Sequence, residues 1–188
     1  MPPVGHTEIV DSVAEHRLLV LSDTHLTTGQ GDRLPVAVWE ALGRATAVIH
    51  AGDVVDADLL DQLRSVVPVH AVLGNNDHGL VGCLPERLEL DIGGLRLAVV
   101  HDSGARVGRA GRLRRWFPQA DLVVFGHSHQ PVNELGEGGQ RLFNPGSPTQ
   151  RRQAPVATYG WVTISPKGAQ ARILAADGSR VVSTAPVH

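Results

Sequence analysis

Short, unbroken apolar runs divide the first half of the chain into predicted strands. Three such runs are Arg17–Ser22, Ala47–Ala51 and Val69–Leu73. Runs of this length without polar alternation are typical of strands that are buried on both faces of a sheet. Between them, Leu34–Ala45 and Ala57–Val66 carry apolar residues at helical spacing. The alternation of strands with helices predicts a parallel sheet with right-handed crossovers.

The pattern changes after the third run, where strands begin to follow one another directly. Arg87–Ile92 and Leu95–Val100 are joined by two glycines, which predicts a hairpin. A helix is expected over Arg106–Trp116 and a buried strand over Leu122–Phe125. Five shorter strand signals complete the chain: Pro131–Leu135, Arg141–Phe143, Ala157–Ile164, Ala169–Leu174 and Val181–Val182. We expect an α/β domain with an antiparallel second half, built from two packed sheets with helices outside.

Length and composition favour one ordinary globular domain. Residues 1–15 lack firm periodicity and are expected to form an N-terminal extension, so residues 16–188 are predicted to be the domain. With 42% hydrophobic residues and a net charge of −2, the chain is not largely disordered and gives no indication of nucleic-acid or membrane binding. No secretory signal pattern is present, no run approaches 18 apolar residues, and Cys83 has no partner for a disulfide. We therefore expect a cytoplasmic protein.

Residues that coordinate metal ions follow directly after five of the predicted strands. They are Asp23, His25, Asp53, Asn75, His101, His127 and His129. In an open α/β sheet the carboxyl ends of the strands form the crevice in which ligands bind. Polar residues are costly at the end of an apolar strand unless something satisfies them there. One such ending is typical of a helix cap, but five endings with the same residue types predict a metal site.

The mixture of ligand types narrows the chemistry of that site. Imidazole nitrogens with carboxylate and amide oxygens favour Mn, Fe, Ni or Zn over Ca or Mg. Seven candidates are too many for one ion and suit two ions that share a carboxylate. Two divalent cations with two aspartates leave a charge of about +2, which favours a hydroxide and an anionic substrate. Two metals about 3.5–4 Å apart are a known arrangement for displacement at phosphorus.

These residues resemble the motifs of the calcineurin-like metallophosphoesterase superfamily, in the same order. The matching segments are Asp23-Thr24-His25, Gly52-Asp53, Gly74-Asn75-Asn76-Asp77, His101 and Gly126-His127-Ser128-His129. A later stretch, Asn144–Ser147 with Arg151 and Arg152, resembles a signature of the small, single-domain phosphodiesterase branch from bacteria and archaea. The resemblance extends from about Arg17 to Ile164 and is highly specific.

The resemblance implies a four-layer α/β sandwich, in which two packed mixed sheets are flanked by helices. It also implies two divalent metal ions, with Mn as the first expectation and Ni, Fe or Zn as alternatives. Asp23, His25 and His129 would hold one ion; Asn75, His101 and His127 would hold the other. Asp53 would bridge them, and a hydroxide that bridges on the other side would attack phosphorus.

Two departures from the family pattern affect the expected reaction. Asn76 stands where many family phosphatases have histidine, and an amide can contact phosphate but cannot protonate a leaving group. This favours phosphodiesters, with Asn76 as a substrate contact, and leaves His78 as a candidate acid or an ordinary loop residue. Asp77 either supports the loop that presents Asn75 or is a turn residue. Asp102 either orients an imidazole or occupies a turn.

Other polar residues have simpler interpretations. His50 is expected to be a hydrogen-bonded core residue and His16 to be solvated. The cluster of Arg106, Arg109, Arg112, Arg114 and Arg115 would receive a polyanionic substrate or form a solvated helix face, and the second interpretation is favoured. The main functional hypothesis is a phosphodiesterase for a small, nucleotide-like phosphoester. A phosphomonoesterase and a non-catalytic metal-binding scaffold of the same fold are the alternatives, and the chain is a candidate homo-oligomer.

Overall fold

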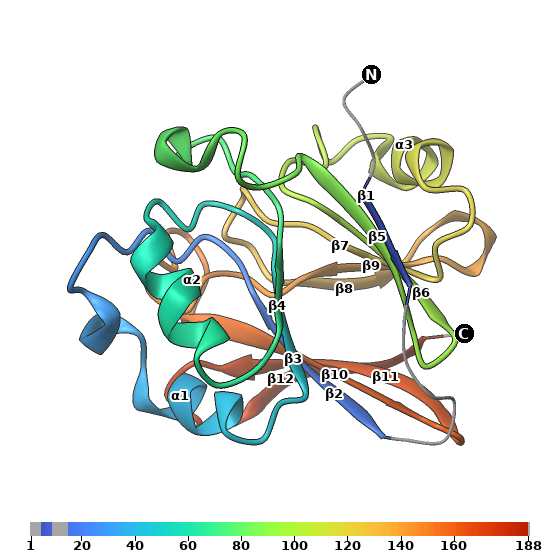
Figure 1. The fold of residues 1–188 in the computed structure, drawn as a ribbon. Coiled ribbons are helices and arrows are strands. Elements are labelled where there is room, and N and C mark those ends of the chain that lie inside the picture. Colours follow the sequence, from blue (N-terminus) through green and yellow to red (C-terminus); the bar gives the residue numbers. More distant parts are fainter. Residues whose placement is uncertain (1–4, 9–14, 188) are drawn as a thin grey trace.

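The computed structural model describes residues 5–8 and 15–187 and contains two six-stranded sheets (Figure 1). The β2 sheet has the order β12 (Val181–Val187), β11 (Gly168–Ala175), β10 (Thr158–Ser165), β2 (His16–Leu21), β3 (Ala47–His50), β4 (Val69–Ala71). The β6 sheet has the order β1 (Gly5–Glu8), β5 (Arg87–Ile92), β6 (Leu95–Val100), β7 (Leu122–Val124), β9 (Arg141–Asn144), β8 (Val132–Leu135). The helices within the described ranges are α1 (Val36–Leu42), α2 (Ala57–Arg64), α3 (Arg109–Trp116) and the short 3-10 segments η1 (Gly31–Arg33), η2 (His78–Leu80) and η3 (Glu137–Gly139).

Three apolar layers hold the sandwich together and explain the unbroken hydrophobic runs. On β2, Leu18 and Val20 pack against the β6 sheet in the central layer, while Leu19 and Leu21 face α1 and α2. A third layer packs α3 against the outer face of the β6 sheet through Leu113 and other side chains. Because both faces of β2 are covered, neither alternate set of residues can be polar. The predicted four-layer sandwich with helices outside is confirmed (Figure 1).

The two sheets do not divide the chain into a parallel and an antiparallel half. Strands β2, β3 and β4 are parallel, as predicted, but β10 returns to pair antiparallel with β2 in the same sheet. In the β6 sheet, β6, β7 and β9 are parallel, whereas β5 and β8 are antiparallel to their neighbours. The predicted antiparallel second half was therefore wrong for β6, β7 and β9 and right for the other strand pairs of that half. Both sheets are mixed because distant strands complete each of them.

Several local predictions also differ from the structure. Gly5–Glu8 pairs in parallel with β5 as β1, although the sequence predicts no strand there; residues 1–4 and 9–14 of the predicted extension lie outside the described residues. His16 is buried at the start of β2, where its ring lies close to Gly93, so the expectation that it is solvated was wrong. Helix α3 begins at Arg109 because Gly108, with φ of 70°, interrupts the predicted helix.

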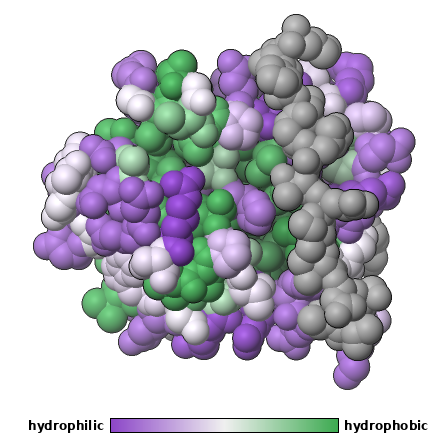
Figure 2. All heavy atoms as spheres, in the orientation of Figure 1, coloured by the Kyte–Doolittle hydropathy of each residue, from purple (hydrophilic) through white to green (hydrophobic). Residues whose placement is uncertain are grey.

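The carboxyl ends of β2, β3, β4, β6 and β7 converge at one end of the sandwich. All five strands are parallel within their own sheets, so the loops that follow them leave on the same side. The face in Figure 2 mixes hydrophilic and hydrophobic side chains, and the exposed large apolar residues of the chain belong to several separate elements. Within the described ranges, no helix is long and apolar enough to span a bilayer.

Candidate metal centre

Sharp backbone reversals at the strand ends point the predicted ligands into a common space. Five of them have a left-handed backbone: Asp23, His25, Asp53, His127 and His129, with φ between 46° and 67°. Among the other described residues, only Val55 and Arg152 share this conformation without being glycine. It costs roughly 1–2 kcal/mol per residue, and such strain persists where surrounding structure imposes it, commonly at functional sites.

The motif glycines allow the strand ends to approach one another closely. A Cβ atom on Gly74 would overlap the backbone nitrogen of Asp53, and one on Gly126 would overlap the hydroxyl of Ser22. Glycine is required at both places because the space for a side chain is already filled, by the backbone of Asp53 at Gly74 and by the Ser22 side chain at Gly126. The glycines that precede Asn75 and His127 are thus explained by packing between strands.

Three side chains form the enclosed group: Asp23, His25 and His129. The Nε2 atom of His129 lies 3.2 Å from His25 Nε2 and 3.4 Å from Asp23 Oδ1. His129 Nδ1 lies 2.5 Å from the carbonyl oxygen of Gln150, and a carbonyl only accepts hydrogen bonds. Nδ1 therefore carries the proton, and the lone pair of Nε2 points at the other two ligand atoms. Converging lone pairs of this kind fit a cation.

Three further side chains form the open group: Asn75, His101 and His127. Asn75 Oδ1 lies 3.0 Å from His101 Nε2 and 2.9 Å from His127 Nδ1. His101 Nδ1 donates to the carbonyl oxygen of Ala51 at 2.7 Å, which directs Nε2 toward Asn75 and Asp53. Those partners are oxygen acceptors, so a proton or a metal ion at Nε2 is needed to make the contacts attractive. The donor set again fits a cation.

Asp53 lies at the junction of the enclosed and open groups. Its Oδ2 atom is 3.5 Å from His25 Nε2 and 3.4 Å from His101 Nε2, one ligand from each group. The backbone nitrogen of Asn76 donates to Asp53 Oδ1 at 2.9 Å, and the amide of Asn76 donates to Oδ2 at 2.7 Å. Asp53 is therefore held in place by Asn76 while its outer oxygen faces both groups.

Buried Asp77 connects the loops after β3 and β4. Its carboxylate accepts hydrogen bonds from the backbone nitrogens of Asp53 at 3.0 Å, Val55 at 2.6 Å and Gly74 at 2.7 Å. Three donors satisfy a carboxylate that would otherwise be costly to bury. Asp77 thus supports the loop that presents Asn75, and it does so by tying that loop to Asp53.

Burial and hydrogen bonding give the two aspartates opposite acidities. Burial raises the pKa of Asp23 to about 6, despite a hydrogen bond from Ser22. Burial alone would also raise the pKa of Asp53, but hydrogen bonds from His101 and Asn76 bring it well below its usual value. The carboxyl of Asp53 therefore stays ionised to a lower pH than that of Asp23.

The histidines also differ in the direction of their pKa shifts. Burial lowers the pKa of His129 to about 4 and also lowers that of His25, so both rings are neutral at pH 7. For His101, burial acts in the same downward direction, but the hydrogen bond and the charge of Asp53 outweigh it and raise the pKa. Neutral imidazole is the form that binds metal.

The remaining predicted residues have distinct positions. Asn76 contacts Asp53 and His78 is exposed at the start of η2. Asp102 accepts from the backbone nitrogen of Gly104 at 2.7 Å, so of its two interpretations the turn applies. His50 is fully buried and shares a hydrogen bond with the Thr24 hydroxyl at 3.1 Å, as expected of a core histidine.

The sequence did not indicate the contacts of the segment after β9. The hydroxyl of Ser147 donates to the carbonyl oxygen of Asp23 at 2.8 Å, and the hydroxyl of Thr149 donates to that of Thr24 at 2.7 Å. Together with the carbonyl of Gln150 on His129, these contacts cover the enclosed group. The match of Asn144–Ser147 to a family signature placed the segment beside the site but could not assign these roles.

Comparisons with known proteins identify relatives in sequence and in fold. A probable metallophosphoesterase from Methanothermobacter thermautotrophicus is 34% identical over 136 residues, which cover 71% of this chain and 77% of the relative. The phosphoesterase YfcE from E. coli superposes with a TM-score of 0.67 at 21% identity, over 92% of this chain and 100% of that one. Vps29 from Entamoeba histolytica, solved with Zn²⁺, gives a TM-score of 0.68 at 23% identity, over 92% and 99%.

The family model for the calcineurin-like phosphoesterase superfamily domain matches residues 17–167. That span contains every strand end of the centre and the segment that covers the enclosed group. The TM-scores show that the fold is shared, and the family model covers most of the chain. The chain therefore belongs to the calcineurin-like phosphoesterase superfamily.

Proposed function

We propose that the protein is a dinuclear metal-dependent phosphodiesterase that acts on small, nucleotide-like phosphoesters in the cytoplasm. The observation that carries the proposal is the position of Asp53, whose Oδ2 atom lies 3.4–3.5 Å from one histidine of each ligand group. A single carboxylate oxygen between two sets of convergent ligands suits a shared ligand for two ions. One ion would leave half of these ligands without a partner.

Asp23, His25, His129 and Asp53 would hold the first ion; Asn75, His101, His127 and Asp53 would hold the second. The nitrogen and oxygen donors suit Mn, our first choice, and also Ni, Fe or Zn. Divalent ions supply Lewis acidity that polarises phosphoryl oxygens and lowers the pKa of water. The chain itself fixes the ligand atoms in advance through Asp77, Asn76 and the carbonyl groups of Ala51 and Gln150.

Asn76 supports diesters over monoesters as substrates. Its amide is engaged with Asp53 and cannot donate a proton to a leaving alkoxide in any orientation. His78, at the exposed start of η2, is the side chain that we propose as a weak substitute acid. Leaving groups that need little protonation are therefore favoured, as in activated diesters. A positive charge beside the ligands would help to bind an anionic substrate. Burial is the main cause that lowers the pKa of His25 and His129, and the nearby charge of Arg152 lowers both further.

The proposal is tested with metal-free protein and a matched pair of substrates. Protein treated with a chelator is reloaded with Mn, and the hydrolysis of bis(p-nitrophenyl) phosphate is compared with that of p-nitrophenyl phosphate. We expect turnover that depends on metal and a higher kcat/KM for the diester. A preference for the monoester would indicate a phosphomonoesterase. Fully loaded protein without turnover on either ester would favour a scaffold.

A matched pair of variants separates loss of the centre from loss of the fold. Asp53→Asn removes the shared charge, whereas Asp61→Asn removes a carboxylate whose side chain is 70% exposed on α2. We expect the first variant to lose activity and bound metal and the second to retain both. Equal activity of the two variants would contradict a metal-dependent role for this centre.

A further inference from the structure

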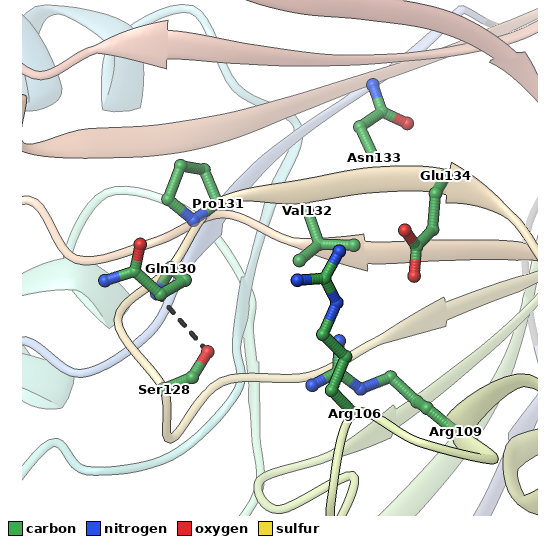
Figure 3. Close-up of a pocket in the computed structure, with 8 residues that line it drawn as sticks. All are labelled: Arg106, Arg109, Ser128, Gln130, Pro131, Val132, Asn133 and Glu134. Carbon is green, nitrogen blue, oxygen red and sulfur yellow. Dashed lines mark hydrogen bonds between the residues drawn. The ribbon is translucent and has the colours of Figure 1, made fainter. Parts of the chain in front are cut away.

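A pocket of about 540 Å³ adjoins the turn that carries two of the predicted ligands (Figure 3). Its wall includes Ser128, which lies between His127 and His129 in the chain, and Gln130, whose backbone nitrogen donates to the Ser128 hydroxyl at 3.3 Å. Pro131 and Val132, at the start of β8, form another part of the wall. The pocket thus includes a residue that is a chain neighbour of one ligand from each group, and its volume is large enough for a sugar with a phosphate.

Two arginines supply the positive charge of this pocket. Arg106 comes from the loop after β6 and Arg109 from the first position of α3; Figure 3 shows both among the side chains that line the pocket, with Arg106 extending toward Val132 of β8. The guanidinium of Arg109 lies 4.9 Å from the centre of the Phe125 ring, and its Nε atom is buried without a hydrogen-bond partner among the residues described. An unsatisfied buried donor of a cation is costly unless an acceptor arrives.

Arg112, one turn further along α3, provides an internal contrast. Its guanidinium donates to the carbonyl oxygens of Ser103 and Ala105 and thereby holds the loop that leads to Arg106. Arg112 is therefore structural. Arg106 and Arg109 form no ion pair within 4.0 Å in the described ranges, and Arg109 is partly buried while Arg106 and Arg115 are exposed.

The charges around Arg109 leave the pocket positive. Glu134 of β8 lines the pocket and Asp102 lies nearby, while Arg106 approaches from the loop before α3 and Arg112 from α3 itself. Two arginines against one lining carboxylate leave a net charge of about +1 on the pocket wall. A guanidinium remains charged at any physiological pH and matches phosphate oxygens with paired N–H donors.

We propose that this pocket binds a second phosphate of the substrate, so that the preferred substrates are nucleotide-like phosphodiesters with a further phosphate monoester. This inference rests on the proposed function, because it assumes that the scissile phosphate lies at the metal centre. The turn from His127 to Gln130 connects the two places. The substrate would be cleaved at one phosphate and recognised through the other.

A pair of chromogenic substrates that differ by one phosphate tests the inference. They are thymidine 5′-(p-nitrophenyl phosphate) and the same compound with a 3′-phosphate. For Mn-loaded protein we expect a kcat/KM about tenfold higher for the 3′-phosphorylated compound, equivalent to about 1.4 kcal/mol. Arg106→Gln and Arg109→Gln should each remove most of this preference and change the rate on the unphosphorylated compound by less than about twofold. Arg115→Gln, an exposed arginine of α3 outside the pocket, is the matched control and should retain the preference.

The outcomes separate this inference from the proposed function. Equal hydrolysis of both compounds, or a loss caused equally by Arg115→Gln, would overturn the pocket inference and leave the phosphodiesterase intact. If neither compound is cleaved, calorimetric binding of thymidine 3′,5′-bisphosphate against thymidine 5′-phosphate still decides the matter. Tighter binding of the bisphosphate that Arg106→Gln abolishes would support the pocket, and equal binding would overturn it. Arg106 is exposed, so its variant is expected to fold even if that of Arg109 does not.

Discussion

The enclosed and open groups use similar residues in opposite surroundings. In the enclosed group Asp23 and His129 have 0% exposed surface, and the segment from Ser147 to Gln150 covers them. In the open group Asn75 and His127 are exposed and only His101 is buried. Protein surrounds one half of the centre while solvent reaches the other. We therefore expect the enclosed half to retain an ion and the open half to admit substrate.

Charge adds to this difference. In the proposed assignment the enclosed group has its own carboxylate, Asp23, besides Asp53, whereas the open group would add only the amide of Asn75 and the imidazoles of His101 and His127 to Asp53. A cation is bound more tightly where more negative charge faces it and where less water screens it. We therefore expect two unequal affinities, with the first ion at Asp23, His25 and His129.

The largest effect is expected from Asp53→Asn, which affects both halves at once. The substitution keeps the size of the side chain but removes the charge that both histidines face. We expect kcat/KM on bis(p-nitrophenyl) phosphate to fall by about 10³-fold, the upper end for one electrostatic group. Bound metal, measured by elemental analysis after dialysis, should fall in the same variant. Retention of two ions would show that Asp53 is not shared.

Single histidine variants test whether the halves are separate. His127→Ala should release the open-half ion and leave about one ion per chain, whereas His129→Ala should weaken the tighter site. Each should lower kcat/KM by roughly 100-fold, as loss of one preorganised electrostatic contact does. The measurement is metal content against free metal concentration. Identical titration curves for the two variants would contradict the proposed inequality.

The packing that brings the halves together is tested by Gly74→Ala. The added Cβ would collide with the backbone of Asp53, and overpacking of this kind costs about 1–3 kcal/mol. Gly79→Ala is the matched control, because a Cβ there meets nothing within 4 Å. Urea unfolding should show a lower midpoint for the first variant and little change for the second. Equal midpoints would mean that the strand ends can separate without cost.

A smaller effect is expected from pH. Protons compete with metal at His101, whose pKa is raised above its ordinary 6.5, and at Asp23, whose pKa is about 6. As the pH falls, the open half should weaken first and the enclosed half below about pH 6, by up to about tenfold per unit for each competing proton. His129, with a pKa of about 4, does not compete in this range. Calorimetric titration at pH 7.5, 6.5 and 5.5 measures both affinities, and affinities that do not change with pH would contradict this assignment.

The sequence by itself determined the elements and the identity of the candidate ligands. Apolar runs located β2, β3 and the β5–β6 hairpin closely, because a strand buried on both faces leaves a local signature in its residues. The ligands were also recognisable locally, since polar residues at the end of an apolar strand need a reason to be there. Helix α3 shows the limit of such signals, because the position of Gly108 moved its start by three residues.

Only the tertiary structure decided which distant segments meet. Strand β10 pairs with β2, more than a hundred residues earlier in the chain. Gln150 contacts His129, which is about twenty residues earlier. Whether a ligand group is enclosed or open depends on such contacts. They also decide that Arg112 donates to the carbonyl oxygen of Ser103, whereas Nε of Arg109 has no hydrogen-bond partner among the described residues. The pattern of apolar residues specifies the period of each helix or strand and the face that it buries. How those faces pack together depends on the shapes of all layers at once. The sequence therefore indicated the chemistry of the centre, and the fold decided how its two halves differ.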